Sequence, residues 1–182
     1  MAKAYAIIAD GTEEVECLGV VDVLRRAGVT TEIVSVGELT VKSSHGVVIT
    51  ADRTIAETDF SDADLIFTPG GMPGTSNIAA CEKVIAAIEQ TLARGKYVAA
   101  ICAAPALVLG ANGFLRGKSA ICFPGFEKHM NGADISTGAR VVTDGQIITA
   151  RGLGCTLELG LALVGLLVGE DKAAQIKEKI QF

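Results

Sequence analysis

Short runs rich in apolar residues alternate along this chain with segments whose apolar residues recur at helical spacing. Each run has the length of one β-strand, and the first four cover residues 4–9, 31–36, 64–68 and 96–101. A strand that is apolar on both sides must be covered on both faces, which is typical of parallel sheets packed between helices. The alternation therefore predicts an α/β fold in which a mainly parallel sheet has helices on both faces, formed as a single domain over residues 1–182.

The segments between and after these strands are predicted to form helices, hairpins and loops. Helical spacing predicts helices over 13–27, 82–94, 155–168 and 171–180, and one that starts after Cys102 and ends before Asn112. Turn-forming residues predict hairpins within 39–50 and 139–149, with a strand over 119–123. Active sites of α/β proteins lie at the carboxyl edge of the sheet, where we expect three loops to meet: 10–16, 69–74 and 102–103.

Composition excludes several classes of function. The formal net charge is −5 and the isoelectric point is about 5.1, so a standing nucleic-acid partner is not expected. The longest apolar run, Leu159–Val168, is shorter than the roughly 20 residues that a membrane-spanning helix needs. The first residues lack the long apolar stretch of a signal peptide. The five cysteines have an odd count and no metal-ligand spacing, which favours reduced thiols, no bound metal and a cytoplasmic protein.

Cys102 stands where an apolar strand changes to an alanine-rich, helix-forming segment. A sharp strand-to-helix turn at this point is similar to the nucleophile elbow of hydrolases, which lifts a side chain above the edge of a sheet. The helix dipole would lower the pKa of a thiol placed there and favour its thiolate. The alternative is that Cys102 is one more buried apolar residue, because free cysteines are among the residues most often buried.

Three carboxylates open the first predicted helix, at positions 13, 14 and 16. Acidic residues favour helix N-termini through the dipole, which accounts for one or two of them. We expect Glu16 to turn inward beside the thiol, where burial would raise its pKa and leave it protonated, able to donate a hydrogen bond to sulfur. The glycine-rich loop offers further donors, and the backbone N–H groups of Gly71 and Ala103 are candidates for an oxyanion hole.

Five segments together resemble the ThiJ/PfpI superfamily and, within it, the branch of the Parkinsonism-associated deglycase and its bacterial relatives. The segments are Ala-Asp-Gly-Thr-Glu-Glu-Val-Glu (9–16), Val-Asp-Val-Leu-Arg-Arg-Ala-Gly (21–28), Pro-Gly-Gly (69–71), Ala-Ile-Cys-Ala-Ala-Pro (100–105) and Thr-Ala-Arg-Gly-Leu-Gly (149–154). The resemblance covers essentially the whole chain. It implies a flavodoxin-like fold, a homodimer, a reactive Cys102 with a protonated Glu16 beside it, and backbone donors at Gly71 and Ala103.

The resemblance also points to residues that would act from a second subunit. It assigns the helix around 20–26 and the loop 43–46 to the subunit interface, which makes His45 and Arg26 candidates for reaching the partner's site. Judged by its neighbours in the sequence alone, His45 is an exposed loop residue. One position departs from part of the family, because some relatives carry a histidine after the elbow helix where this chain has Phe123. The obvious general base of a hydrolase is therefore missing.

Two functions of different kinds follow from the resemblance. The first is a glyoxalase or deglycase without a cofactor, acting on methylglyoxal or glyoxal and their early adducts with proteins or nucleotides in carbonyl or oxidative stress. The second is a redox sensor or stress chaperone that works through oxidation of Cys102 to a sulfinate. A peptidase or glutamine amidotransferase would need a histidine beside the cysteine, so this third class is disfavoured.

Overall fold

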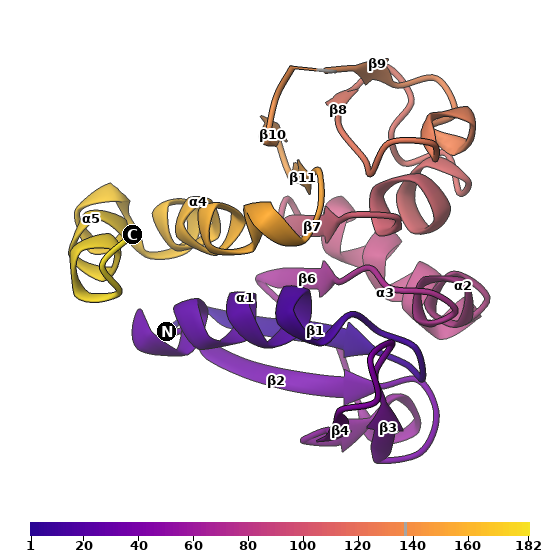
Figure 1. Ribbon diagram of the computed structural model, residues 1–182, viewed down its shortest axis with the longest axis horizontal. Coiled ribbons are helices and arrows are strands. Elements are labelled where there is room, and N and C mark those ends of the chain that lie inside the picture. Colours follow the sequence, from indigo (N-terminus) through magenta and orange to yellow (C-terminus); the bar gives the residue numbers. More distant parts are fainter. Residues whose placement is uncertain (137) are drawn as a thin grey trace.

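The computed structural model describes residues 1–136 and 138–182, with a seven-stranded sheet at its centre (Figure 1). The strand order is β10-β11-β7-β6-β1-β2-β5, and neighbouring strands are parallel except β10 and β11. The strands span Lys3–Ile8 (β1), Thr30–Ser35 (β2), Arg53–Thr54 (β5), Leu65–Thr68 (β6), Tyr97–Ile101 (β7), Val141–Asp144 (β10) and Ile147–Ala150 (β11). The predicted mainly parallel sheet is confirmed.

Two helical layers cover the sheet, and alternating side chains along β1 divide the core between them. Ala4, Ala6 and Ile8 pack toward one layer, whereas Tyr5 and Ile7 pack toward the other. The first layer holds α1 (Glu14–Arg26), α4 (Thr156–Val168) and α5 (Glu170–Lys179). The second holds α2 (Gly74–Ala79), α3 (Glu82–Ala93) and the π-helix Pro105–Gly110. The result is a flavodoxin-like α/β sandwich, as the family resemblance implies.

Smaller elements surround this sandwich. The predicted hairpin is formed by β3 (Thr40–Lys42) and β4 (Val48–Thr50), and β8 (Ser119–Ala120) pairs in parallel with β9 (Asp134–Ile135). Short 3₁₀ helices span Ile55–Glu57, Glu127–His129 and Leu153–Cys155. Within residues 1–136 and 138–182, no helix is both long enough and apolar enough to cross a membrane.

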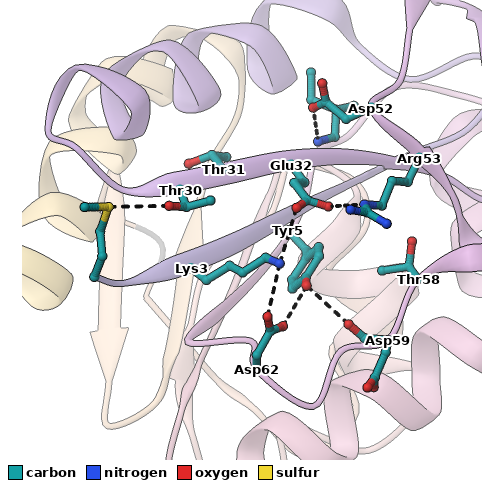
Figure 2. Close-up of polar contacts among 12 residues, drawn as sticks. Lys3, Tyr5, Thr30, Thr31, Glu32, Asp52, Arg53, Thr58, Asp59 and Asp62 are labelled. Atoms are coloured by element: carbon teal, nitrogen blue, oxygen red, sulfur yellow. Dashed lines mark hydrogen bonds and ion pairs between the residues drawn. The ribbon is translucent and has the colours of Figure 1, made fainter.

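A network of polar and charged side chains connects β1, β2, β5 and the loop before β6 (Figure 2). Glu32 on β2 forms ion pairs with two cations: its oxygens lie 2.7 Å from Arg53 Nε and 3.3 Å from Lys3 Nζ. Asp62 extends the network, since its oxygens lie 3.1 Å from Lys3 Nζ and 2.7 Å from the Tyr5 hydroxyl. Charges of this kind discourage pairing of an edge strand with another chain. Arg53 places such a charge on the edge strand β5, and the network lies apart from the loops expected at the active site.

The structure corrects the predicted loop after β6. The helix α2 begins at Gly74, the last residue of the predicted loop 69–74, and it continues through Ala79, where no helix is predicted from the sequence. At the start of this helix, the backbone of Gly74 lies against the backbone of Thr12. Glycine is needed there because a Cβ would collide with the Thr12 N. Ile78 fills the core of the second layer. Tertiary contacts therefore outweigh the weak helix propensity of this segment.

The segments that follow β7 also differ from expectation. The predicted strand 119–123 ends at Ala120, because the chain turns and the Phe123 N–H donates to the Cys102 carbonyl. The helix after Cys102 is a π-helix and not an α-helix, and the Ala111 N–H donates to the carbonyl of Ala106 five residues earlier. Such wide turns are frequent at functional sites.

Candidate active site

Cys102 follows β7 directly and occupies the sharp turn that the sequence predicts. Its φ is +66°, a left-handed conformation that costs a residue with a side chain about 1–3 kcal/mol. Two contacts fix this backbone: the Cys102 N–H donates to the Ala150 carbonyl at 3.0 Å, and the Cys102 carbonyl accepts the Phe123 N–H at 2.7 Å. The half-buried thiol is thereby presented at the carboxyl end of β7.

Glu16 lies in the first turn of α1 and is only 1% exposed, which confirms the inward-facing carboxyl. Its Oε2 accepts the Gly70 N–H at 2.8 Å. The carboxyl also forms hydrogen bonds with the Cys102 thiol and the backbone N–H of Leu153. Burial is the main cause that raises the pKa of Glu16 from 4.5 to about 7, and the charge of Glu13 acts in the same direction.

The pKa of Cys102 shifts in the direction opposite to the prediction. Burial first, and the charge of Glu16 second, raise the pKa of this thiol to about 12. The predicted lowering was wrong because the pull of a helix terminus is smaller than the effects of burial and of a second negative charge. The N–H groups of Ala103 and Gly71 donate to the sulfur and oppose the rise. When Glu16 carries a proton its charge is absent, and both donors still face the sulfur.

The structure thus brings Cys102, Glu16, Gly71 and Ala103 together, and it adds the N–H groups of Gly70 and Leu153. Sequence reasoning missed these last two donors. Both belong to segments that carry the family resemblance, which was the available signal. Every residue except proline has a backbone N–H, so the amino-acid type gives no sign of which N–H points into the site.

A methyl group at Gly70 is expected to disturb the whole site. A Cβ there would lie 2.6 Å from both Cys102 Cβ and Glu16 Oε2. We expect Gly70→Ala to lower the free energy of unfolding by about 1–3 kcal/mol and to slow alkylation of Cys102, because one of these side chains must move. Gly37→Ala is the matched control, since a Cβ at Gly37 meets nothing within 4 Å. Urea unfolding measures the effect, and equal stability of the two variants would contradict it.

The contacts that His45 and Arg26 make in the structure do not involve Cys102. The His45 side chain is 72% exposed, and its Nδ1 lies 3.5 Å from Glu14 Oε2 and 3.9 Å from Glu13 Oε1. Arg26, at the end of α1, pairs with Asp22 at 2.6 Å. Among the described residues, Glu13, Glu14 and His45 form the one group of three or more His, Cys, Asp or Glu side chains whose ligand atoms all lie within 4.8 Å of one another. The contacts of His45 with the two carboxyl groups account for this spacing, and we assign no metal to it. The role of His45 and Arg26 toward a second subunit stays a prediction.

Comparisons with known proteins match residues 2–166 to the DJ-1/PfpI family. Protein DJ-1 homolog B of Arabidopsis thaliana is 37% identical over 175 residues, which are 96% of this chain but only 40% of that protein's length. Deglycase PH1704 of Pyrococcus horikoshii is 28% identical over 150 residues, covering 82% of this chain and 89% of the relative. The structure of oxidized Toxoplasma gondii DJ-1 has a TM-score of 0.93 and 32% identity, covering 100% of this chain and 99% of that one. The chain therefore belongs to the DJ-1/PfpI family.

Proposed function

We propose that this protein is a cofactor-independent glyoxalase or deglycase that acts on methylglyoxal, glyoxal and their early adducts with proteins or nucleotides. One observation carries the proposal: a thiol on a strained elbow is hydrogen-bonded to a buried carboxyl whose pKa is raised to about 7. The pair supplies a nucleophile and a proton carrier at one place. The Pyrococcus horikoshii relative is named a deglycase, which supports the same class of reaction.

The reaction begins with a proton transfer inside the pair. Above about pH 7, Cys102 and Glu16 hold one proton between them. Moving it from sulfur to Glu16 produces a thiolate that faces the N–H groups of Gly71 and Ala103. The thiolate adds to the aldehyde carbon of methylglyoxal, and the same N–H groups stabilise the charge that develops on the aldehyde oxygen. That oxygen then takes the proton from Glu16, which gives a hemithioacetal.

The ionised Glu16 next moves a proton between the two carbons of the adduct. It removes the proton from the carbon bound to sulfur while the hydroxyl proton on that carbon passes to the former ketone oxygen, which leaves an enediolate. Glu16 then returns its proton to the neighbouring carbon, and the product is the thioester of lactate. The aldehyde carbon is oxidised while the ketone carbon is reduced, so the step needs no external electron acceptor. Water hydrolyses the resulting thioester, releasing lactate and restoring the thiol.

Phe123 determines which residue performs these proton transfers. It occupies the position at which some relatives have a histidine, and it is 46% exposed, with its ring beside Gly152. A phenyl ring carries no proton. The proposal therefore assigns every proton transfer to Glu16, and hydrolysis of the thioester has no second base.

Lactate formation from methylglyoxal by the purified protein tests the proposal. Substrate loss and product identity are followed together, since simple trapping of the aldehyde by thiols and amines consumes substrate without forming lactate. We expect catalytic turnover that depends on Cys102. A protein that forms no lactate between about pH 6 and 8 is not a glyoxalase of this kind.

Oxidation of Cys102 is a second candidate function, in which the protein is a redox sensor or stress chaperone. A sulfinate is an anion, and the N–H groups of Gly71 and Ala103 with a protonated Glu16 are suitable donors for it. The Toxoplasma gondii relative is described as oxidized. All five cysteines are free thiols, which suits the reducing cytoplasm where we place the protein. Mass spectrometry after mild peroxide would show two oxygen atoms added at Cys102, without lactate formation, if this function holds.

We also propose a homodimer that forms through the outer surface of α1 and the start of α4. These two helices pack against each other, and exposed apolar side chains lie on them and on the 3₁₀ helix that precedes α4: Val15, Leu18, Leu153 and Leu157. A paired surface would remove these side chains from water. It would also bring His45 and Arg26 of one subunit toward the Cys102 site of the other, as the family resemblance implies.

Leu18→Glu is expected to weaken the dimer at least about 100-fold, because it places two like charges in an apolar interface. Sedimentation equilibrium measures the mass, which for the wild type should be twice the 18.8 kDa of one chain. Val168→Glu is the control, since Val168 is also exposed but lies at the other end of α4. A monomeric wild type, or a dimer that tolerates Leu18→Glu, would contradict this assignment.

A further inference from the structure

Glu13 links the first turn of α1 to the loop that carries Gly70. It is the N-cap residue of α1 and is only 7% exposed. Its Oε2 accepts the Glu16 N–H at 2.6 Å, and its own N–H donates to the Gly70 carbonyl at 2.9 Å. The Gly70 N–H in turn donates to the Glu16 carboxyl at 2.8 Å. The three residues therefore form a closed ring of hydrogen bonds around the carboxyl that faces Cys102.

We propose that Glu13 is a positioning residue of this site: through the ring it holds the Glu16 carboxyl at the Cys102 sulfur, and its negative charge keeps a proton on Glu16. Glu13 acts through Glu16 and not on the substrate. The inference deepens the proposed function and rests on it for the role of Glu16 as proton carrier.

The groups that face Glu16 come from four segments. Glu13 lies at the helix start and Cys102 at the elbow, while Gly70 and Leu153 contribute N–H groups from two loops. Glu13 and Cys102 are the titratable groups among them. A protonated thiol is neutral, so Glu13 supplies the neighbouring charge. That charge raises the pKa of Glu16, in the same direction as burial.

On its other side, Glu13 meets the loop between β3 and β4. His45 Nδ1 lies 3.9 Å from Glu13 Oε1 and 3.5 Å from Glu14 Oε2, and the Ser44 hydroxyl donates to Glu14 at 3.4 Å. Glu14 thus has the same charged surroundings, but its observed contacts are with the loop and not with Glu16. Glu14→Gln is therefore a matched control that removes one negative charge and leaves the ring intact.

The competing explanation is that Glu13 serves only as the N-cap of α1. Serine and aspartate are good N-cap residues and could replace Glu13 in that role. Glu13→Ser keeps a capping oxygen without the charge, and Glu13→Gln keeps the length and an acceptor oxygen without the charge. Glu13→Asp keeps both a cap and the charge. If Glu13 were only a cap, the serine variant would behave like the wild type. If Glu13 is a positioning residue, Glu13→Ser and Glu13→Gln should change the alkylation of Cys102 in the same way, and Glu13→Asp should restore it.

The readout is the rate at which iodoacetamide alkylates Cys102 in the whole protein, measured by mass spectrometry at a series of pH values. Without the Glu13 charge Glu16 loses its proton more readily, so the midpoint of the profile should fall by about 0.5–1 pH unit. The same shift lowers the share of thiolate paired with protonated Glu16, so the plateau rate should fall about three- to tenfold. Glu13→Asp and Glu14→Gln should keep the wild-type profile.

Wild-type profiles in both Glu13→Ser and Glu13→Gln would overturn the proposal. Circular dichroism identifies a variant that does not fold, and if one neutral variant fails, the other decides. Unfolding of both would assign Glu13 to the stability of the helix start and would also overturn it. Alkylation needs no turnover, so a wild type that forms no lactate would refute the proposed function alone and leave this profile as a separate result.

Discussion

Cys102→Ser is expected to lower kcat/KM for methylglyoxal by at least about 10³-fold. Serine has nearly the volume of cysteine, so the elbow, the donors at Gly71 and Ala103 and the Glu16 carboxyl should stay in place. A hydroxyl loses its proton far less readily than a thiol, and a carboxyl with a pKa of about 7 cannot take it. The loss of activity in this variant therefore measures the contribution of the sulfur nucleophile apart from the other groups of the site.

Initial rates of lactate formation measure this loss, and Cys81→Ser provides the control. Cys81 is partly exposed, like Cys102, but it stands before α3 in the other helical layer, and its replacement should leave the rate unchanged. Cys17 is a poor control, because it is fully buried and burial raises its pKa to about 12. A Cys102→Ser variant that keeps more than about a tenth of the activity would show that the reaction does not pass through sulfur.

The fold could be predicted wherever strands are apolar on both faces. In β1, Ile7 and Ile8 are both fully buried although they face opposite layers, and this is the property that the sequence displays directly. The helix α2 could not be predicted in this way. It follows Pro73 and begins with Gly74, both poor helix formers, and its stability comes from contacts of Ile78 with distant segments.

The site could be predicted as far as side chains define it. Cys102 was recognisable from the change of pattern around it, and Glu16 from an excess of carboxylates at a helix start. Gly70 and Leu153 act through backbone N–H groups, whose direction only the fold determines. The pKa of Cys102 was predicted in the wrong direction, because burial and the charge of Glu16 arise from packing between segments far apart in the sequence.

Glu16→Gln and Glu16→Leu are both expected to lower kcat/KM by about 10²–10⁴-fold, the usual contribution of a general acid–base residue. Neither side chain can carry the proton from one carbon to the other. Glutamine keeps an oxygen that can accept the Gly70 N–H, whereas leucine does not, so the pair of variants separates proton transfer from hydrogen bonding. Lactate assays at several pH values measure both. A glutamine variant with wild-type activity would show that Glu16 is not the proton carrier.

The same replacements are expected to change how stability depends on pH. Burial raises the pKa of Glu16 from 4.5 to about 7, so between these values the folded state keeps a proton that the unfolded state has lost. The contribution of Glu16 to the free energy of unfolding therefore falls by about 3 kcal/mol as the pH rises through this window, and it is constant above it. Urea unfolding at several pH values should show this fall in the wild type relative to Glu16→Leu. Glu158→Gln, which removes an exposed carboxylate paired with Arg140, should keep the fall. A difference between wild type and Glu16→Leu that stays constant with pH would mean that the pKa of Glu16 is not raised on folding, and Glu16 would then be too weak a base to take the thiol proton.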